Sequence, residues 1–333
     1  MSETLLRVED LRVRFQSRLR RTTAVDGISL EVGTGEVVSL VGETGCGKTV
    51  TALSILRLLP SSATVTGHIT FRGRDLLALK ESEMQAVRGA EISMVFQNPA
   101  TALNPVFSIG SQLRQVIRAH IDLDKQAVEA RIEEVLQSVG LPEVDRILRA
   151  YPHQMSGGML QRAMLAMSLA CRPALLIADE PTTALDVTIA AQILRLIRRL
   201  QEEQGFSVLF VTHDLGIVRR VSDRVVVLYA GRVAEVARTP DLLRQPRHPY
   251  AQGLLAAVPR GAARGSQLAA IPGTVPPDVS VITGCAFADR CPHVFDRCRI
   301  ERPALLGGAE GHWAACHLLD PARAPGHPAE ATT

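Results

Sequence analysis

The sequence predicts an α/β fold built on a mostly parallel sheet, and three observations lead to this prediction. Short apolar runs of strand length, such as residues 37–41 and 207–212, alternate with stretches of helical apolar spacing, such as residues 187–204. A glycine-rich turn joins the first of these runs to a helical stretch over residues 49–59. Hydrophobic residues make up 46% and charged residues 21% of the 333 residues, which is the usual composition of a globular protein.

The remaining elements follow from the same patterns in chain order. Apolar and charged residues alternate over residues 6–15 and 65–71, which is typical of half-buried strands. From about residue 98 to residue 172 the pattern is helical and carries no strand, so we expect a helical insertion between two strands of the sheet. The last helix of this insertion is expected over residues 157–171, and strands are expected after it over residues 174–178, 207–212, 224–228 and 232–237, the last two as a hairpin.

The chain divides into a large domain and a small extension. After about Pro259 the composition shifts to Gly, Pro, Ala and Cys, so we place a boundary there. The expected domains are residues 1–258 and residues 259–333. A main domain of about 250 residues with an extension agrees with the length of the chain.

Charge and composition exclude several classes of partner. Lys and Arg number 37 against 34 Asp and Glu, and aromatic residues are only 4%, so we expect no nucleic-acid partner. The first ten residues include acidic side chains and no apolar run of signal-peptide length. No apolar run approaches the roughly 18 residues that a membrane span needs. The expected location is therefore cytoplasmic, with any membrane role exerted through partners.

A phosphate-binding loop is predicted between the strand at residues 37–41 and the helix that follows it. The pattern Gly-x-x-x-x-Gly-Lys-Thr is that of a P-loop, and its strand–loop–helix context distinguishes it from a chance glycine-rich turn. Its glycines let backbone N–H groups face phosphate oxygens, Lys48 reaches the β- and γ-phosphates, and Thr49 offers a hydroxyl to Mg²⁺. The predicted nucleotide-binding residues of this loop are Gly42, Glu43, Thr44, Gly45, Cys46, Gly47, Lys48 and Thr49.

Two carboxylates end the apolar strand that begins near residue 174. Asp179 is placed to bind Mg²⁺ beside the P-loop, and Glu180 is then free to polarise an attacking water. The alternative is an ordinary strand end with two solvated acidic side chains, which the presence of a P-loop makes the weaker interpretation.

Further motifs in a fixed order identify a family. A glutamine, Gln97, follows the P-loop, and Ser156-Gly157-Gly158 precedes the two carboxylates. Ala184-Leu-Asp186 and a strand that ends at His213 come after them. With these motifs the sequence resembles the ATP-binding subunits of ABC transporters over residues 1 to about 258. The resemblance implies a P-loop NTPase of the ABC ATPase type with a helical subdomain insertion.

The resemblance also implies roles for these residues. Two such subunits would face head to tail and enclose ATP between the P-loop of one and Ser156, Gly157 and Gly158 of the other. Gln97 would contact Mg²⁺ or the attacking water and link the site to the helical insertion. His213 would contact the γ-phosphate, and Asp186 would cross the interface between subunits. Phe15, which ends the first strand, is either the residue that stacks on adenine or a core aromatic.

One subfamily matches further. Met155 and Met159 flank the Ser-Gly-Gly core, where most of the family has Leu and Gln; this pattern resembles the ATPase subunits of dipeptide and oligopeptide importers. Residues 247–255 resemble the end of their nucleotide domain, and residues 271–292 resemble their C-terminal extension. The resemblance implies a peripheral subunit on the cytoplasmic face of the membrane. Its implied partners are two transmembrane permeases, a second and paralogous ATPase, and an extracellular substrate-binding protein.

Four of the six cysteines gather in the extension and form a candidate metal site. Four thiols suffice for tetrahedral zinc or for an iron–sulfur cluster, and their spacing matches neither a common zinc ribbon nor a ferredoxin run. The resemblance to peptide-importer subunits favours a [4Fe–4S] cluster, with Zn²⁺ and free thiols as alternatives. Two nearby histidines, His312 and His317, are expected at the surface. The candidate ligands are Cys285, Cys291, Cys298 and Cys316.

Two other functions compete with peptide import. The same machine could carry nickel, glutathione or an antimicrobial peptide, because cargo selection in this family belongs to other subunits. The other alternative is a soluble ABC-type ATPase that acts on ribosomes or DNA. Such proteins usually have two nucleotide domains in one chain or a long coiled-coil insertion, whereas this chain has one P-loop and no sustained heptads.

Overall fold

The computed structural model describes residues 3–16, 21–183, 185–258, 271–276, 278–307 and 311–320. The predicted domain boundary at residue 259 and Ala184 lie outside these residues. Among the described residues, none of the helices combines the length and the apolar character that crossing a bilayer requires.

Over the described residues, the main sheet has eight strands in the order β11-β12-β10-β9-β3-β8-β7-β6. Its five strands from β9 to β6 run parallel to one another, and the strands on the other side of β9 pair antiparallel. The parallel strands are short and almost fully buried, because helices or the second sheet cover both faces. The strands are β3 (Val37–Val41), β6 (Ile92–Val95), β7 (Leu175–Asp179), β8 (Ser207–Thr212), β9 (Arg224–Tyr229), β10 (Arg232–Arg238), β11 (Leu306–Gly307) and β12 (Trp313–Ala314).

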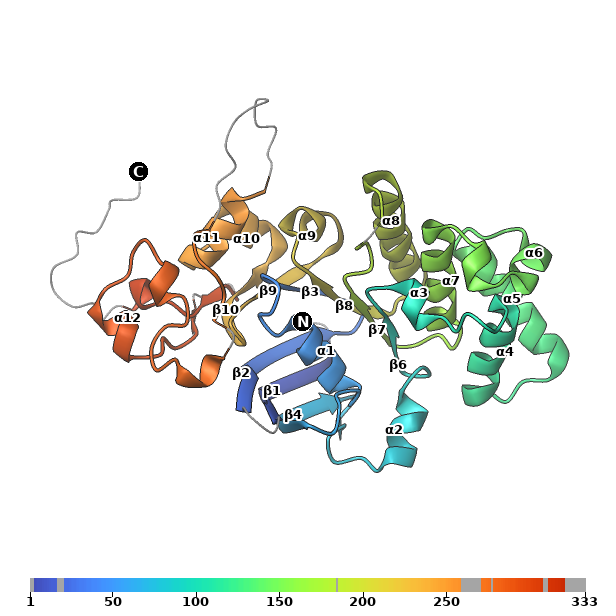
Figure 1. Ribbon diagram of the computed structural model, residues 1–333, viewed down its shortest axis with the longest axis horizontal. Coiled ribbons are helices and arrows are strands. Elements are labelled where there is room, and N and C mark those ends of the chain that lie inside the picture. The colour runs from blue at the N-terminus through green and yellow to red at the C-terminus, as the bar shows by residue number, and fades with distance from the viewer. Residues whose placement is uncertain are drawn as a thin grey trace.

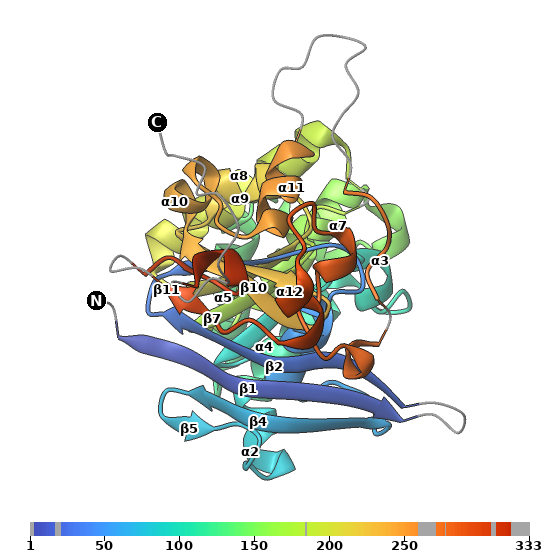
Figure 2. The same ribbon diagram turned by 90° about the vertical axis from the view of Figure 1, so that its left-hand side faces the viewer.

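A second, antiparallel sheet has the order β2-β1-β4-β5 and packs below the main sheet (Figures 1 and 2). The main sheet confirms the predicted mostly parallel sheet, but the first strands belong to this separate antiparallel sheet, which the sequence did not predict. Strands β1 and β2 are separated by only a few residues, and so short a connection can join antiparallel neighbours only. Strand β2 was also not predicted. The strands are β1 (Thr4–Gln16), β2 (Arg21–Gly33), β4 (Ala63–Phe71) and β5 (Arg74–Asp75).

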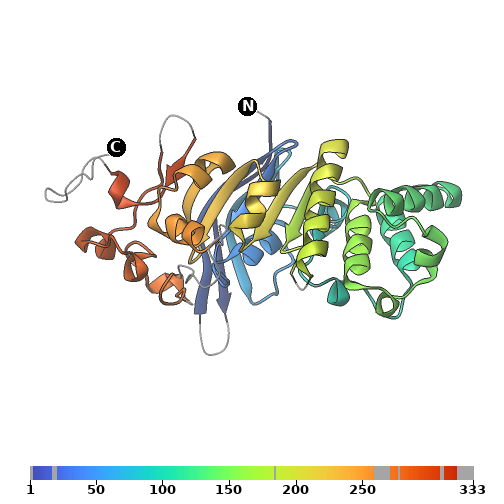
Figure 3. The same cartoon turned by 90° about the horizontal axis from the view of Figure 1, so that it is seen from above.

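The predicted helical insertion lies between the neighbouring parallel strands β6 and β7. Its helices bury a continuous apolar core that includes Leu113, Ile132 and Leu165. Figures 1 and 3 show this helical layer at one end of the molecule and the C-terminal extension at the other. The helices of the insertion are α3 (Pro99–Ala102), α4 (Ile109–His120), α5 (Lys125–Ser138), α6 (Val144–Arg149) and α7 (Gly157–Leu169).

The other helices connect the strands of the two sheets. Helix α1 follows the P-loop and packs against β2, β7 and β8. Helix α8 begins at Val187 and ends at Gln204, as the sequence predicts. The bounds are α1 (Lys48–Ile55), α2 (Glu81–Val87), α8 (Val187–Gln204), α9 (Leu215–Val221), α10 (Thr239–Arg244), α11 (Pro249–Ala256) and, in the extension, α12 (Asp296–Ile300).

The extension joins the main domain through the edge of the main sheet and a buried carboxylate. Strand β12 pairs with β10, so the extension adds strands to the sheet. Glu235 of β10 is fully buried and accepts the N–H groups of Arg247 and His248, and it pairs with Nε2 of His312 at 2.6 Å. The expectation that His312 and His317 lie at the surface is wrong: both are buried, because one binds Glu235 and the other contacts the carbonyl of Glu301.

Candidate active site

The candidate site lies at the carboxyl edge of the parallel strands. The P-loop follows β3, and Gln97 follows β6 by two residues. Asp179 ends β7, and His213 follows β8 directly. Because the strands are parallel neighbours, the segments after them meet at one edge, which is where open α/β sheets bind ligands.

The P-loop is tightly fitted into its surroundings. A Cβ on Gly42 would collide with the carbonyl oxygen of Leu228, and Gly47 has a φ of 101° with the carbonyl of Ala24 only 2.8 Å from where its Cβ would lie. Only glycine meets both requirements at these positions. Lys48 is buried, and its Nζ donates to the carbonyl oxygens of Gly42 at 2.7 Å and Glu43 at 3.0 Å.

Thr49 and Asp179 come together where the Mg²⁺ site is predicted. The Thr49 hydroxyl donates to Oδ1 of Asp179 at 3.1 Å. Burial raises the pKa of Asp179, and the hydrogen bond from Thr49 offsets part of that rise. A hydroxyl and a desolvated carboxylate are oxygen ligands of the kind that Mg²⁺ prefers, and a cation would stabilise this buried charge. The residues therefore fit the ion.

Glu180 is held by three side chains from three segments. Gln97 Nε2 and Thr183 Oγ1 each donate to its Oε2 at 3.0 Å, and His213 Nδ1 lies 3.0 Å from its Oε1. Burial alone would raise the pKa of Glu180, but the hydrogen bonds with His213 and Thr183 outweigh it and lower the pKa. The carboxylate is therefore ionised at neutral pH.

Backbone strain also marks this position. Glu180 has a φ of 44°, a left-handed conformation that costs a non-glycine residue about 1 to 2 kcal/mol. Such strain persists where the surrounding structure fixes it, and it concentrates at functional sites. Thr183 is the member of the group that sequence reasoning missed, because nothing in its neighbourhood distinguishes it from an ordinary turn residue.

The Ser-Gly-Gly segment opens helix α7 at a distance from the P-loop. Ser156 caps the helix through its Oγ, which accepts the N–H of Met159 at 3.3 Å. A Cβ on Gly158 would lie 3.0 Å from Ile189 of α8, so space at this helix end is limited. Helix α7 packs on α3, α4, α5 and α8, and Figure 1 shows it well separated from α1. Within one chain the structure does not bring this segment to the P-loop.

The two other predicted residues have clear positions. Asp186 caps α8, and its Oδ1 accepts the N–H groups of Thr188 and Ile189 at 3.0 Å. Phe15 lies near the end of β1, is half-buried and packs against the core between the two sheets. Its role in stacking on adenine stays a prediction.

The four cysteines of the extension lie within electrostatic range of one another. Burial, together with the neighbouring thiols, raises the pKa of Cys285 to about 11 and that of Cys316 to about 12. Cys298 and Cys316 are both buried, whereas Cys291 is half-buried. However, the side chains that the structure describes include no group of three or more His, Cys, Asp or Glu arranged to hold a metal ion.

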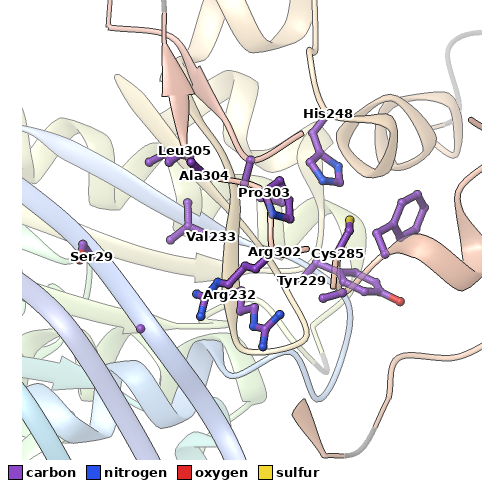
Figure 4. A pocket seen from close by; sticks show the side chains of 15 residues that line it. Ser29, Tyr229, Arg232, Val233, His248, Cys285, Arg302, Pro303, Ala304 and Leu305 are labelled. Atoms are coloured by element: carbon purple, nitrogen blue, oxygen red, sulfur yellow. The ribbon is translucent and has the colours of Figure 1, made fainter. Parts of the chain in front are cut away.

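A cavity of about 340 Å³ lies between the extension and the hairpin β9–β10 (Figure 4). Cys285, Tyr229 and His248 line it together with two arginines, Arg232 and Arg302. Both arginines bind Asp26, at 2.9 Å and 3.2 Å. The cavity lies at the interface between the main domain and the extension, and none of the predicted nucleotide-binding residues lines it.

Comparison with known families agrees with this geometry. The sequence model of the ABC transporter family matches residues 25–183. The family model for the C-terminal region of oligopeptide/dipeptide transporters matches residues 234–298. A probable peptide ABC transporter ATP-binding protein of Sinorhizobium fredii is 48% identical over 95% of each chain. The dipeptide transport ATP-binding protein DppD of Bacillus subtilis is 46% identical over 96% of each chain.

Solved structures show the same fold over the main domain. A dimeric ATP-binding cassette in a post-hydrolysis state with ADP and phosphate bound has a TM-score of 0.63 at 26% identity, covering 70% of this chain and 98% of the other. The protein cbiO1 of Clostridium perfringens, part of an ABC transporter complex, has a TM-score of 0.63 at 26% identity, covering 73% of this chain and 92% of its own.

Proposed function

This chain belongs to the ATP-binding subunits of ABC transporters that carry the oligopeptide/dipeptide C-terminal region, and on this premise we propose that it drives the import of di- or oligopeptides. The observation that carries the proposal is the set of contacts at the strand ends. Thr49 is hydrogen-bonded to Asp179, and Glu180 contacts both Gln97 and His213. The chain is an ATPase, and these contacts would form its hydrolytic site. The relatives are named as peptide and dipeptide transport proteins, which favours peptides over nickel or glutathione.

The chain's own residues divide the work of hydrolysis. The P-loop amides and Lys48 bind the triphosphate, so Lys48 must turn from the loop carbonyls to the phosphates when ATP enters. Thr49, Asp179 and Gln97 would hold Mg²⁺, which when bound neutralises charge on the β- and γ-phosphates. Glu180, already ionised, polarises the water for in-line attack. His213, released from Glu180, would then contact the γ-phosphate.

The site requires a second ATPase subunit. Ser156, Gly157 and Gly158 begin a helix whose N–H groups and positive end suit a phosphate, yet they lie away from the P-loop of their own chain. We propose that they complete the site of a partner subunit in a head-to-tail pair, with Asp186 at the interface. The similar cassette with ADP and phosphate bound is dimeric, which supports the pairing of two such subunits. As in the subfamily, the partner would be a paralogue.

The remaining partners are proposed from the family. Two transmembrane permeases would receive the helical insertion on the cytoplasmic face of the membrane, and an extracellular binding protein would deliver the peptide to them. An action on ribosomes or DNA is not favoured, because the relatives with near-complete coverage are transport subunits.

We further propose that Cys285, Cys291, Cys298 and Cys316 hold a metal centre, a [4Fe–4S] cluster first and Zn²⁺ second. Four thiols in one small segment are the supporting chemistry, and the described arrangement itself forms no such group. Anaerobic purification followed by iron, sulfide and zinc assay tests it. About four iron and four sulfide per chain are expected. One zinc without iron would reject the cluster, and neither metal would reject the centre.

Substituting Lys48 tests the proposed function. Lys48→Ala removes the cation that binds the β- and γ-phosphates, so ATP binding and uptake of labelled dipeptide by cells should both fall to background. Lys80→Ala, which removes an exposed lysine before α2 and outside the helical insertion, is the matched control and should leave both unchanged. Normal dipeptide uptake with Lys48→Ala would contradict the proposal.

A further inference from the structure

An ion pair joins the C-terminal extension directly to the P-loop. Arg290 of the extension binds both carboxylate oxygens of Glu43, with Nη1–Oε2 at 2.8 Å and Nη2–Oε1 at 3.1 Å. Only 7% of the Arg290 side chain and 27% of the Glu43 side chain are exposed. A bidentate pair in this degree of burial has a defined geometry, unlike an exposed pair between mobile side chains.

The guanidinium of Arg290 is fully occupied. Besides Glu43, it donates to the carbonyl oxygens of Pro272 at 2.7 Å and Ile271 at 3.2 Å and to the hydroxyl of Tyr229 at 3.3 Å. These contacts use as many hydrogen bonds as an arginine has N–H donors. The extension therefore fixes the position of the Arg290 side chain, and Arg290 in turn fixes the position of the Glu43 carboxylate.

An aromatic cluster supports the same junction. The rings of Tyr229 and Tyr250 lie 4.7 Å apart, and Phe287 lies 5.1 Å from Tyr229. Arg290 lies 5.6 Å from the Tyr229 ring. The hydroxyl of the fully buried Tyr250 accepts the backbone N–H of Glu43 at 2.9 Å. Figure 4 shows Tyr229 beside the cavity at this junction. Both the backbone and the side chain of Glu43 are thus held by groups outside the P-loop.

We infer that Arg290 is a positioning residue for ATP binding, because it neutralises Glu43 and holds this carboxylate away from the triphosphate. Glu43 lies next to Gly42 in a loop that receives several negative charges, so its unpaired carboxylate would repel them. The extension is therefore part of the support of the nucleotide site. The inference rests on the nucleotide site proposed above and adds a role for the extension in it.

The test is equilibrium binding of Mg·ATP to the purified full chain. Arg290→Gln should weaken binding about tenfold, the scale of a typical coupling between sites, and raise KM with kcat little changed. Arg290→Lys, which keeps the charge without the bidentate geometry, should fall between it and the wild type. Arg299→Gln removes an exposed charge that binds Asp289 in the same extension and should have no effect.

Substitutions of Glu43 separate charge from folding. In Glu43→Gln/Arg290→Gln no carboxylate is left, so binding should return to within about threefold of the wild type. Glu43→Asp leaves the extension intact but shortens the carboxylate, so that it loses Arg290 and should weaken binding as Arg290→Gln does. Wild-type affinity in Glu43→Asp, or no recovery in the double variant, would overturn the inference. Absence of Mg·ATP binding by the wild-type chain would instead reject the nucleotide site itself.

Discussion

Glu180→Gln tests the assignment of the water-polarising base. The amide has nearly the shape of the carboxylate, so the fold should be retained. Its oxygen can accept from Gln97 and Thr183, and its NH₂ group can face Nδ1 of His213. It cannot take a proton from water. Loss of a general base costs about 100- to 10,000-fold in rate, which corresponds to about 3 to 5 kcal/mol. ATP affinity should be unchanged or higher, because a negative charge beside the phosphates is gone.

The assay combines binding of labelled ATP with single-turnover hydrolysis, so that affinity and chemistry are measured separately. Glu203→Gln, which neutralises an exposed carboxylate on α8, is the matched control and should hydrolyse ATP at the wild-type rate. If Glu180→Gln hydrolyses ATP within threefold of the wild type, the base lies elsewhere. If it loses ATP binding, Glu180 holds the site together rather than acting on water.

Three further predictions concern His248, Gly158 and Glu235. Burial lowers the pKa of His248 from 6.5 to about 4. The free energy of unfolding should therefore fall by about 3 kcal/mol as the pH falls from 6.5 to 4, because the unfolded chain takes up a proton that the folded chain does not. The substitution His248→Asn should flatten the pH dependence of the denaturation midpoint. An unchanged slope would contradict this. Gly158→Ala should keep ATP binding but slow turnover about 100-fold in the assembled complex, since its Cβ would press on Ile189; normal turnover would contradict the role at the partner's site. Glu235→Ala should cost about 3 kcal/mol and expose the extension to limited proteolysis, because His312 loses its buried partner; wild-type resistance would contradict it.

Local patterns predict the elements whose burial is regular. Strands β3 and β8 and helix α8 begin and end where the sequence predicts, because each has an unbroken apolar run or an amphipathic pattern with a cap. The ends of parallel strands meet at one edge, so the meeting of Gln97, Glu180 and His213 could also be expected from the sequence. These features depend on short segments and a simple topology.

Long-range partners could not be predicted in this way. Strand β2 mixes buried and partly buried positions, and its pairing with β1 shifts register repeatedly, so its alternation is broken. The two-residue strands β11 and β12 exist only because β10 offers an edge. Arg290 lies 247 residues from Glu43, and no local pattern marks either as the other's partner. The sequence therefore indicates a separate extension, whereas in the structure the extension contacts the P-loop.

If this ATPase works within a peptide importer, it should be bound to the other importer subunits at the membrane. The decisive measurement is affinity purification of the chain from detergent-solubilised membranes, with mass spectrometry of the co-purifying proteins. We expect two polytopic permeases and a second ATPase in stoichiometric amounts, with ATP hydrolysis by the isolated complex. Recovery of the chain alone, or with ribosomes, would contradict it.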